Sequence, residues 1–142
     1  MIRLFIDSSV LFSAAYSSRG HSRDLLMMAA REEVILVISP LVVNETRRNL
    51  SESAPAIVHL FDLIIKTIPF EFVQPTKEEV LDAAKYAVLK DAPILAAARI
   101  AQIEMLVTLD KKHLLGKPEL ETYLGKRIVA PKEAVTYLKS AG

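Results

Sequence analysis

Short apolar runs of strand length alternate with helical stretches along the whole chain, and this alternation limits the folds open to it. Most of the runs carry no polar face, which is typical of strands buried on both faces of a parallel sheet. The apolar runs lie at residues 2–6, 34–38, 70–73, 105–108 and 127–129. We therefore predict an α/β protein with a parallel or mostly parallel central sheet.

Helix signals fill the intervals between these runs. Ser39 and Pro40 supply an N-cap and a first-turn proline, and Thr76 with Glu79 forms a capping box. Helices are expected at residues 10–16, 21–31, 40–50, 56–68, 76–89, 94–102 and 131–139. The sequence shows no internal repeat and no linker, so we expect residues 1–142 to form a single domain.

Charge and composition exclude several kinds of protein. With a formal net charge of +1, nucleic-acid binding would need local basic patches or a metal ion. The sequence contains no cysteine, which excludes disulfides, thiolate zinc sites and cysteine nucleophiles. No apolar stretch approaches the roughly 18 residues of a membrane span, and the N-terminal run is too short for a signal peptide. We expect a cytoplasmic protein with no membrane association.

Acidic residues stand where the chain leaves or enters the predicted strands. Asp7 directly follows the first run, and Asp110 lies two residues beyond Thr108 at the end of the fourth. Because parallel strands end at one edge of the sheet, these two carboxylates should lie at the same edge. Asp91 and Glu45 lie near the starts of helices that can face that edge.

Converging carboxylates need a cation. Two of them about 4 Å apart repel by roughly 4 kcal/mol at an effective dielectric constant near 20. An all-oxygen cluster selects Mg²⁺ or Mn²⁺ over zinc, and such ions activate water and neutralise charge at a phosphate.

Each acid also has a purely structural interpretation. Asp91 could be only an N-cap, Glu45 a solvated helix residue, and Asp110 a turn former. Asp7 is harder to explain this way, because a carboxylate directly after a wholly apolar strand is poorly placed for stability. The four acids taken together favour a site.

Four segments give the sequence a resemblance to PIN-domain nucleases, a family that includes the VapC-type toxins of prokaryotic toxin–antitoxin pairs. The segments are Phe5-Ile6-Asp7-Ser8-Ser9-Val10-Leu11, Ser39-Pro40-Leu41-Val42-Val43-Asn44-Glu45, Lys90-Asp91-Ala92-Pro93-Ile94-Leu95-Ala96-Ala97-Ala98 and Leu106-Val107-Thr108-Leu109-Asp110. The resemblance covers nearly the whole chain. It implies a three-layer α/β/α fold around a central, mostly parallel sheet and a metal-dependent endoribonuclease activity on RNA.

The resemblance also assigns residues. The acids that catalyse the reaction and bind Mg²⁺ or Mn²⁺ correspond to Asp7, Glu45, Asp91 and Asp110. Thr108 matches the family's small hydroxyl residue before the last acid. A toxin of a toxin–antitoxin pair would bind a protein antitoxin, and homodimers are common in the family.

Two positions depart from the family pattern. Ser9 stands where the family often has asparagine, and it can still hold a water or a carboxylate by hydrogen bond. The segment 111–113, Lys-Lys-His, stands where many members carry a further acid. This change either weakens a second metal site or supplies phosphate contacts, so we expect one well-occupied ion. His113 is interpreted as a solvated surface histidine in preference to a base or a metal ligand.

Basic and apolar surfaces suggest binding partners. Arg47, Arg48, Lys111 and Lys112 would lie at the rim of the site and could hold RNA phosphates, although a solvated face explains them as well. The helix at 56–68 is apolar nearly all round, so part of it is expected in an interface. In the family this region borders the groove where an antitoxin docks.

Other functions fit less well. A haloacid-dehalogenase-like phosphatase would usually carry a second aspartate two residues after the first, where Ser9 stands. Phosphate-binding glycine motifs are absent, since the sequence has only four glycines. The remaining alternative is a catalytically inactive PIN-like module that binds RNA or protein, which the presence of all four acids disfavours.

Overall fold

A computed structural model describes residues 1–141. Within them, five strands form one sheet in the order β3-β2-β1-β4-β5, and every strand pair is parallel. The strands are β1 (Arg3–Ile6), β2 (Ile35–Ile38), β3 (Glu71–Phe72), β4 (Met105–Val107) and β5 (Arg127–Val129). The predicted α/β class with a mostly parallel sheet is therefore confirmed, and the sheet is parallel throughout.

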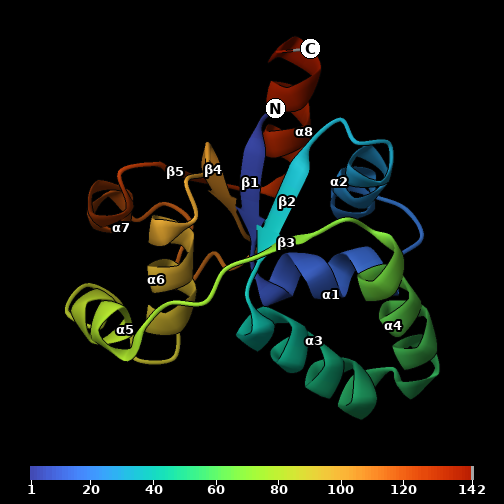
Figure 1. The fold of residues 1–142 in the computed structure, drawn as a ribbon, viewed down its shortest axis with the longest axis horizontal. Coiled ribbons are helices and arrows are strands. Elements are labelled where there is room, and N and C mark those ends of the chain that lie inside the picture. The colour runs from blue at the N-terminus through green and yellow to red at the C-terminus, as the bar shows by residue number, and fades with distance from the viewer. Residues whose placement is uncertain (142) are drawn as a thin grey trace.

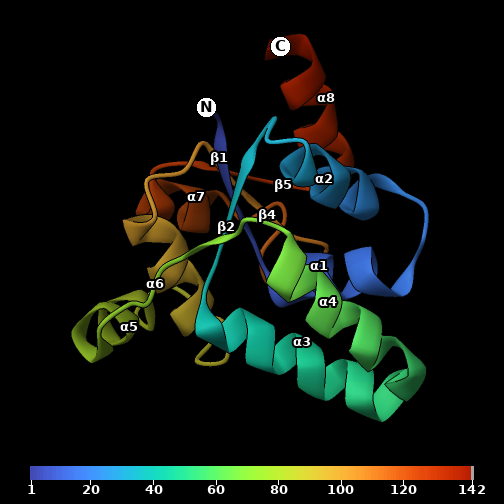
Figure 2. The ribbon, with the colours of Figure 1, turned by 45° about the vertical axis from the view of Figure 1, so that its right-hand side comes forward.

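Helices cover both faces of this sheet (Figures 1 and 2), which confirms the predicted three-layer arrangement. On one side α5, α6 and α7 pack together, and on the other α2 packs against α1 and α8. The helices are α1 (Ser8–Tyr16), α2 (His21–Ala30), α3 (Pro40–Ser53), α4 (Val58–Thr67), α5 (Lys77–Ala83), α6 (Ala92–Ile100), α7 (Pro118–Leu124) and α8 (Pro131–Ala141). None of the helices in residues 1–141 is long and apolar enough to cross a membrane.

The central strands are buried because their neighbours cover every side. Phe5 pairs with Val37 on β2 and with Leu106 on β4, and all three side chains are fully buried. The apolar run at residues 2–6 therefore correctly predicted a central strand. The chain leaves β1 directly into α1, with Asp7 as the helix N-cap. This junction fixes the position of the first acid.

Two helices differ most from the prediction. The helix expected at 76–89 ends at Ala83, because the next turn is closed by tighter hydrogen bonds, among them Tyr86 N–H to the Ala83 carbonyl. Tyr86 then stacks on Tyr123, with ring centroids 4.6 Å apart. Helix α7 was not predicted, although Pro118 at its start and Gly125 at its end are ordinary boundary signals. Gly125 adopts a left-handed conformation with φ of 73°.

Candidate active site

An open pocket of about 790 Å³ lies beyond the C-terminal ends of β1 and β4. All four predicted acids line it, and each comes from a different part of the fold. Asp7 caps α1, Glu45 lies on α3, Asp91 precedes α6, and Asp110 lies in the loop after β4. The convergence of these residues at one sheet edge agrees with the prediction from strand direction.

Asp7 is buried and held by three donors. Its Oδ1 accepts hydrogen bonds from Ser9 Oγ at 2.6 Å and from the Val10 N–H at 3.2 Å. Its Oδ2 accepts from Thr108 Oγ1. The carboxylate of Asp7 therefore also has a structural role, because it caps α1 and joins β1 to β4. Burial nevertheless raises the pKa of Asp7 against the opposing effect of these hydrogen bonds.

Two hydroxyls connect the first acid to the loop that carries the last. Ser9 Oγ accepts from the Leu109 N–H at 3.0 Å while donating to Asp7. Thr108 Oγ1 accepts from the Asp110 N–H at 3.0 Å while donating to Asp7. The two residues predicted to support the site thus fix the relative positions of Asp7 and Asp110.

Asp91 stands at the N-cap of α6 but does not act as a capping residue. Its side chain makes no capping hydrogen bond. Its Oδ2 is buried and has no hydrogen-bond partner among residues 1–141. Burial, followed by the negative charge of Asp110, raises the pKa of Asp91. The structural interpretation of Asp91 as only an N-cap does not fit these contacts.

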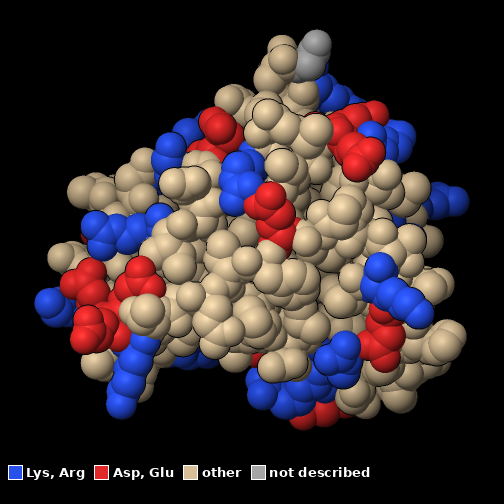
Figure 3. Space-filling view, in the orientation of Figure 1, with Lys and Arg blue, Asp and Glu red and all other residues tan. Residues whose placement is uncertain are grey.

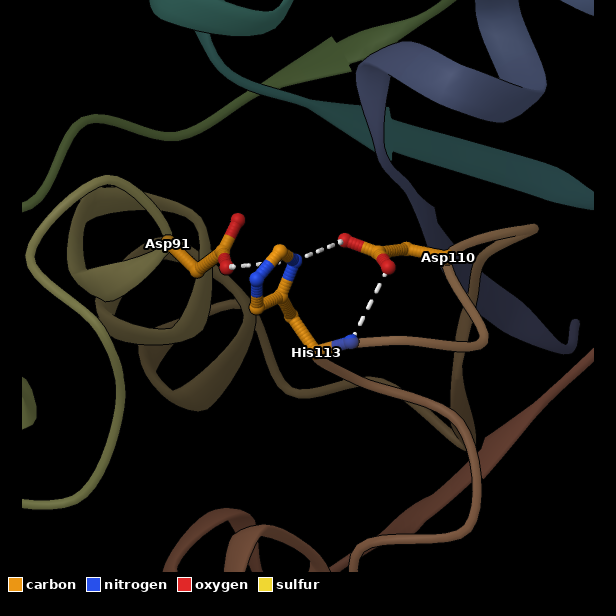
Figure 4. A group of neighbouring side chains, drawn as sticks. All are labelled: Asp91, Asp110 and His113. Atoms are coloured by element: carbon orange, nitrogen blue, oxygen red, sulfur yellow. Dashed lines mark hydrogen bonds and ion pairs between the residues drawn. The ribbon is translucent and has the colours of Figure 1, made fainter.

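Asp110 closes a turn and also faces the pocket. Its Oδ1 accepts from the backbone N–H groups of Lys112 and His113, both at 3.0 Å. Its Oδ2 lies 3.3 Å from His113 Nδ1 (Figure 4). Burial by itself raises the pKa of Asp110, but the hydrogen bonds and charge of His113 outweigh it, so the net pKa is lowered.

His113 is not the solvated histidine expected from its lysine-rich surroundings. Only 27% of its side chain is exposed, and the ring lies between two of the acids. Its Nδ1 is 4.0 Å from Asp91 Oδ2 as well as 3.3 Å from Asp110 Oδ2. Sequence spacing to Asp110 hinted at this contact, but nothing in the sequence indicated the approach to Asp91.

Glu45 is half-buried at the wall of the pocket. Burial raises the pKa of Glu45, while the positive charges of Arg48 and Lys90 oppose the shift. The negative charges of Asp91 and Asp7 add to it. Glu45 therefore lies close enough to Asp7 and Asp91 for their charges to affect its pKa. This environment does not fit the interpretation of Glu45 as a solvated helix residue.

Basic residues reach the pocket in a different combination from the one predicted. The described residues that line it include Arg48, Lys90 and Lys112, but neither Arg47 nor Lys111. Arg47 donates to Asp62 at 2.8 Å and lies over the Phe61 ring, so its guanidinium is engaged elsewhere. Lys90 was missed, although it directly precedes Asp91.

The geometry of the pocket suits a hard cation. Carboxylate oxygens from four elements face one space, and ligand atoms of Asp91, Asp110 and His113 lie within 4.8 Å of one another. The unpartnered Asp91 oxygen fits a cation better than it fits a purely protein environment.

Comparisons with known proteins identify the family. The PIN domain family matches residues 3–112, which is most of the chain, so this chain belongs to the PIN domain family. No curated protein matches the chain in sequence.

Solved structures share the fold at low sequence identity. PAE2754 from Pyrobaculum aerophilum is 19% identical over 98% of this chain and 96% of its own, with a TM-score of 0.70. VapC20 from Mycobacterium tuberculosis, a sarcin-ricin loop cleaving toxin, is 14% identical over 77% of this chain and 91% of its own, with a TM-score of 0.59. FitAcB from Neisseria gonorrhoeae is 15% identical over 90% of this chain and 97% of its own, with a TM-score of 0.58. At these identities the similarity concerns the fold.

Proposed function

We propose that this protein is a metal-dependent endoribonuclease, with Mg²⁺ or Mn²⁺ held by the carboxylates of Asp7, Glu45, Asp91 and Asp110. The observation that carries the proposal is the convergence of these four acids, from four elements, on one open pocket. Membership of the PIN domain family supports it independently. The oxygen-rich donor set favours hard cations over zinc.

The electrostatics of the pocket support a bound cation. The pKa values of Asp7, Glu45 and Asp91 are all raised, with burial as the largest cause in each. A nearby divalent charge would stabilise the ionised form of all three carboxylates. When bound, such an ion supplies a water of lowered pKa and neutralises charge on a phosphate.

The chain's own residues would position both the cation and the substrate. Ser9 and Thr108 hold the carboxylate of Asp7 in one orientation. Arg48, Lys90 and Lys112 line the same pocket and would contact backbone phosphates on either side of the cleaved bond. Because this charge is local, binding should weaken steeply with added salt even though the whole chain is nearly neutral.

We further propose that the protein acts in the cytoplasm as the toxin of a toxin–antitoxin pair, as a single domain that forms a homodimer. The likeness to VapC20, a sarcin-ricin loop cleaving toxin, supports a toxin role, and a toxin of such a pair would bind a protein antitoxin. Large apolar side chains are exposed in several places, among them one group on α4 and another on and just after α5. These two groups are Leu60 and Leu63 on α4, and Leu81, Tyr86, Val88 and Leu89 near α5. The face in Figure 3 also has a broad central area with few charged atoms.

The activity has a direct test. Purified protein should degrade single-stranded RNA in Mg²⁺ or Mn²⁺ and lose that activity in excess chelator, with recovery when the ion is restored. The Glu119→Gln variant changes an exposed acid on α7 that does not line the pocket, and it should behave as the wild type does. Full cleavage in chelator would overturn the metal mechanism, and cleavage equal in preparations that carry Asp7→Asn would show a contaminating nuclease.

A further inference from the structure

The ring of His113 lies between two acids of the proposed active site. Its Nδ1 is 3.3 Å from Asp110 Oδ2 and 4.0 Å from Asp91 Oδ2. Figure 4 shows the imidazole edge turned toward both carboxylates. Nδ1 and two carboxylate oxygens present lone pairs to one another, so this grouping needs either a proton or a cation between its members.

The Asp91 oxygen provides a second and independent observation. Asp91 is 6% exposed, and its Oδ2 is buried without a hydrogen-bond partner among residues 1–141. Buried polar atoms in proteins almost always have a partner, so this atom requires an explanation. The N-cap function does not provide one, because the side chain makes no capping bond. The unpartnered oxygen is directed toward the His113 ring, as Figure 4 shows.

The separations fit the coordination shell of one small divalent ion. At metal–ligand distances of about 2.1 Å, neighbouring ligands in an octahedron are about 3.0 Å apart and opposite ligands about 4.2 Å apart. The observed 3.3 Å and 4.0 Å lie between these limits. All three ligand atoms lie within 4.8 Å of one another, so small side-chain movements would bring them around one ion.

We propose that His113 Nδ1 is a ligand of a divalent cation held between Asp91 and Asp110, which makes this position prefer Mn²⁺ to Mg²⁺. The inference rests on the proposed function, since it concerns the same pocket. The preference follows from ligand chemistry: imidazole nitrogen binds first-row transition ions well, whereas Mg²⁺ strongly prefers oxygen. His113 would therefore bind the ion directly and not merely orient Asp110.

A positioning role makes a different prediction from a ligand role. If His113 only orients Asp110 by a hydrogen bond, its removal lowers the affinities for Mn²⁺ and Mg²⁺ to a similar extent. If Nδ1 is a ligand, its removal weakens the binding of Mn²⁺ more than that of Mg²⁺, because an imidazole nitrogen suits the transition ion better than it suits Mg²⁺. The ratio of the two affinities therefore separates the roles.

Electron paramagnetic resonance with Mn²⁺ alone tests the ligand directly. The chain has three histidines, so a His21→Ala/His59→Ala variant retains only His113. Both of the replaced residues are exposed and lie outside the pocket lining, so the variant should fold. Electron spin-echo modulation from a coordinated ¹⁴N should appear in the wild type and in this variant, and disappear in His113→Ala.

Calorimetric titration with each ion completes the test. His113→Ala should lower the affinity for Mn²⁺ about tenfold or more while changing that for Mg²⁺ much less. His113→Asp should instead raise the affinity for Mg²⁺ relative to Mn²⁺. Mn²⁺ bound to the wild type without nitrogen modulation, or equal losses for both ions in His113→Ala, would overturn the inference and leave the nuclease proposal standing. A wild type that binds neither ion would overturn both.

Discussion

The two sides of the pocket are built differently. On the β1 side, both oxygens of Asp7 accept hydrogen bonds from Ser9, Val10 and Thr108. On the α6 side, Asp91 keeps a buried oxygen without a hydrogen-bond partner among residues 1–141, and this oxygen lies 4.0 Å from His113 Nδ1. The protein's own hydrogen bonds thus fix the carboxylate of Asp7, whereas the buried oxygen of Asp91 remains for a ligand to bind.

This difference has a physical consequence for how the site can bind an ion. A rigid acid supplies one ligand position that is organised before binding, which reduces the ordering cost. An acid without a partner gains more from a cation than an acid already stabilised by donors. The Asp7 side should therefore set the position of the ion, and the Asp91 side should contribute much of the stabilisation that binding gives.

The largest effect is expected when the charge of Asp7 is removed. Asp7→Asn should lower RNA cleavage by about a hundredfold or more, since even partners of metal ligands often contribute 10–100-fold. The fold should persist with a melting temperature within about 5 °C of the wild type, because Asn keeps an oxygen for the Val10 N–H. Cleavage assays and thermal melts measured on one preparation check both parts. Outright unfolding of the variant would make Asp7 a structural residue only.

Thr108→Val should destabilise the β1 side of the pocket by removing hydrogen bonds and not by changing charge. The change removes the donor to Asp7 Oδ2 and the acceptor for the Asp110 N–H, in a residue that is fully buried. Loss of these partners should lower the free energy of unfolding by about 1–3 kcal/mol in urea titrations. The matched control is Thr136→Val on the exposed face of α8, which should change it by less than about 0.5 kcal/mol. Equal effects of the two changes would refute the bridging role of Thr108.

Asp91→Asn, on the α6 side of the pocket, should stabilise the metal-free protein, whereas Thr108→Val should destabilise it. Without added metal it should raise the free energy of unfolding by up to about 1 kcal/mol, because burial and the charge of Asp110 disfavour the Asp91 carboxylate. With Mn²⁺ at about 100 times its dissociation constant, the wild type should gain about 2.7 kcal/mol and the variant clearly less. Denaturant titrations in chelator and in Mn²⁺ measure both quantities. A variant that gains as much from Mn²⁺ as the wild type would remove Asp91 from the metal site.

The smallest effect expected is a pH dependence that distinguishes Asp7 from its neutral replacement. The pKa of Asp7 is raised by burial, so the native state holds a proton at pH values where the unfolded chain has lost it. Stability from this group is therefore complete below about pH 4 and is lost as pH rises through the raised native pKa. In chelator, wild-type stability should fall more than that of Asp7→Asn as pH rises from about 4 to 8. Parallel pH profiles of melting temperature would contradict the shift.

Much of this protein follows from local sequence pattern. The apolar run at residues 2–6 predicted a central buried strand, and strand direction alone placed Asp7 and Asp110 at one edge of the sheet. These inferences succeed because burial on both faces is encoded in consecutive residues, and because parallel strands share an edge whatever the details of packing.

Other features depend on contacts between segments far apart in the chain. Arg47 and Arg48 are adjacent in sequence, yet only Arg48 lines the pocket, because Asp62 on α4 engages Arg47. The helix expected to continue past Ala83 ends there, and Tyr86 beyond it stacks against Tyr123. Local propensity carries no information about partners supplied by another element, so these choices required the tertiary structure.

His113 shows the same limit at the site itself. Its position three residues after Asp110 is local, and the hydrogen bonds of that turn follow from aspartate chemistry. Its approach to Asp91 is not local, because the β4 loop and the start of α6 must be packed before the two side chains meet. The sequence by itself determined which acids line the pocket and at which edge of the sheet they gather. Only the packing of β4 against β1 and of α6 beside them decided that a histidine stands between two of those acids, since that distance is set by the whole core and by no single segment.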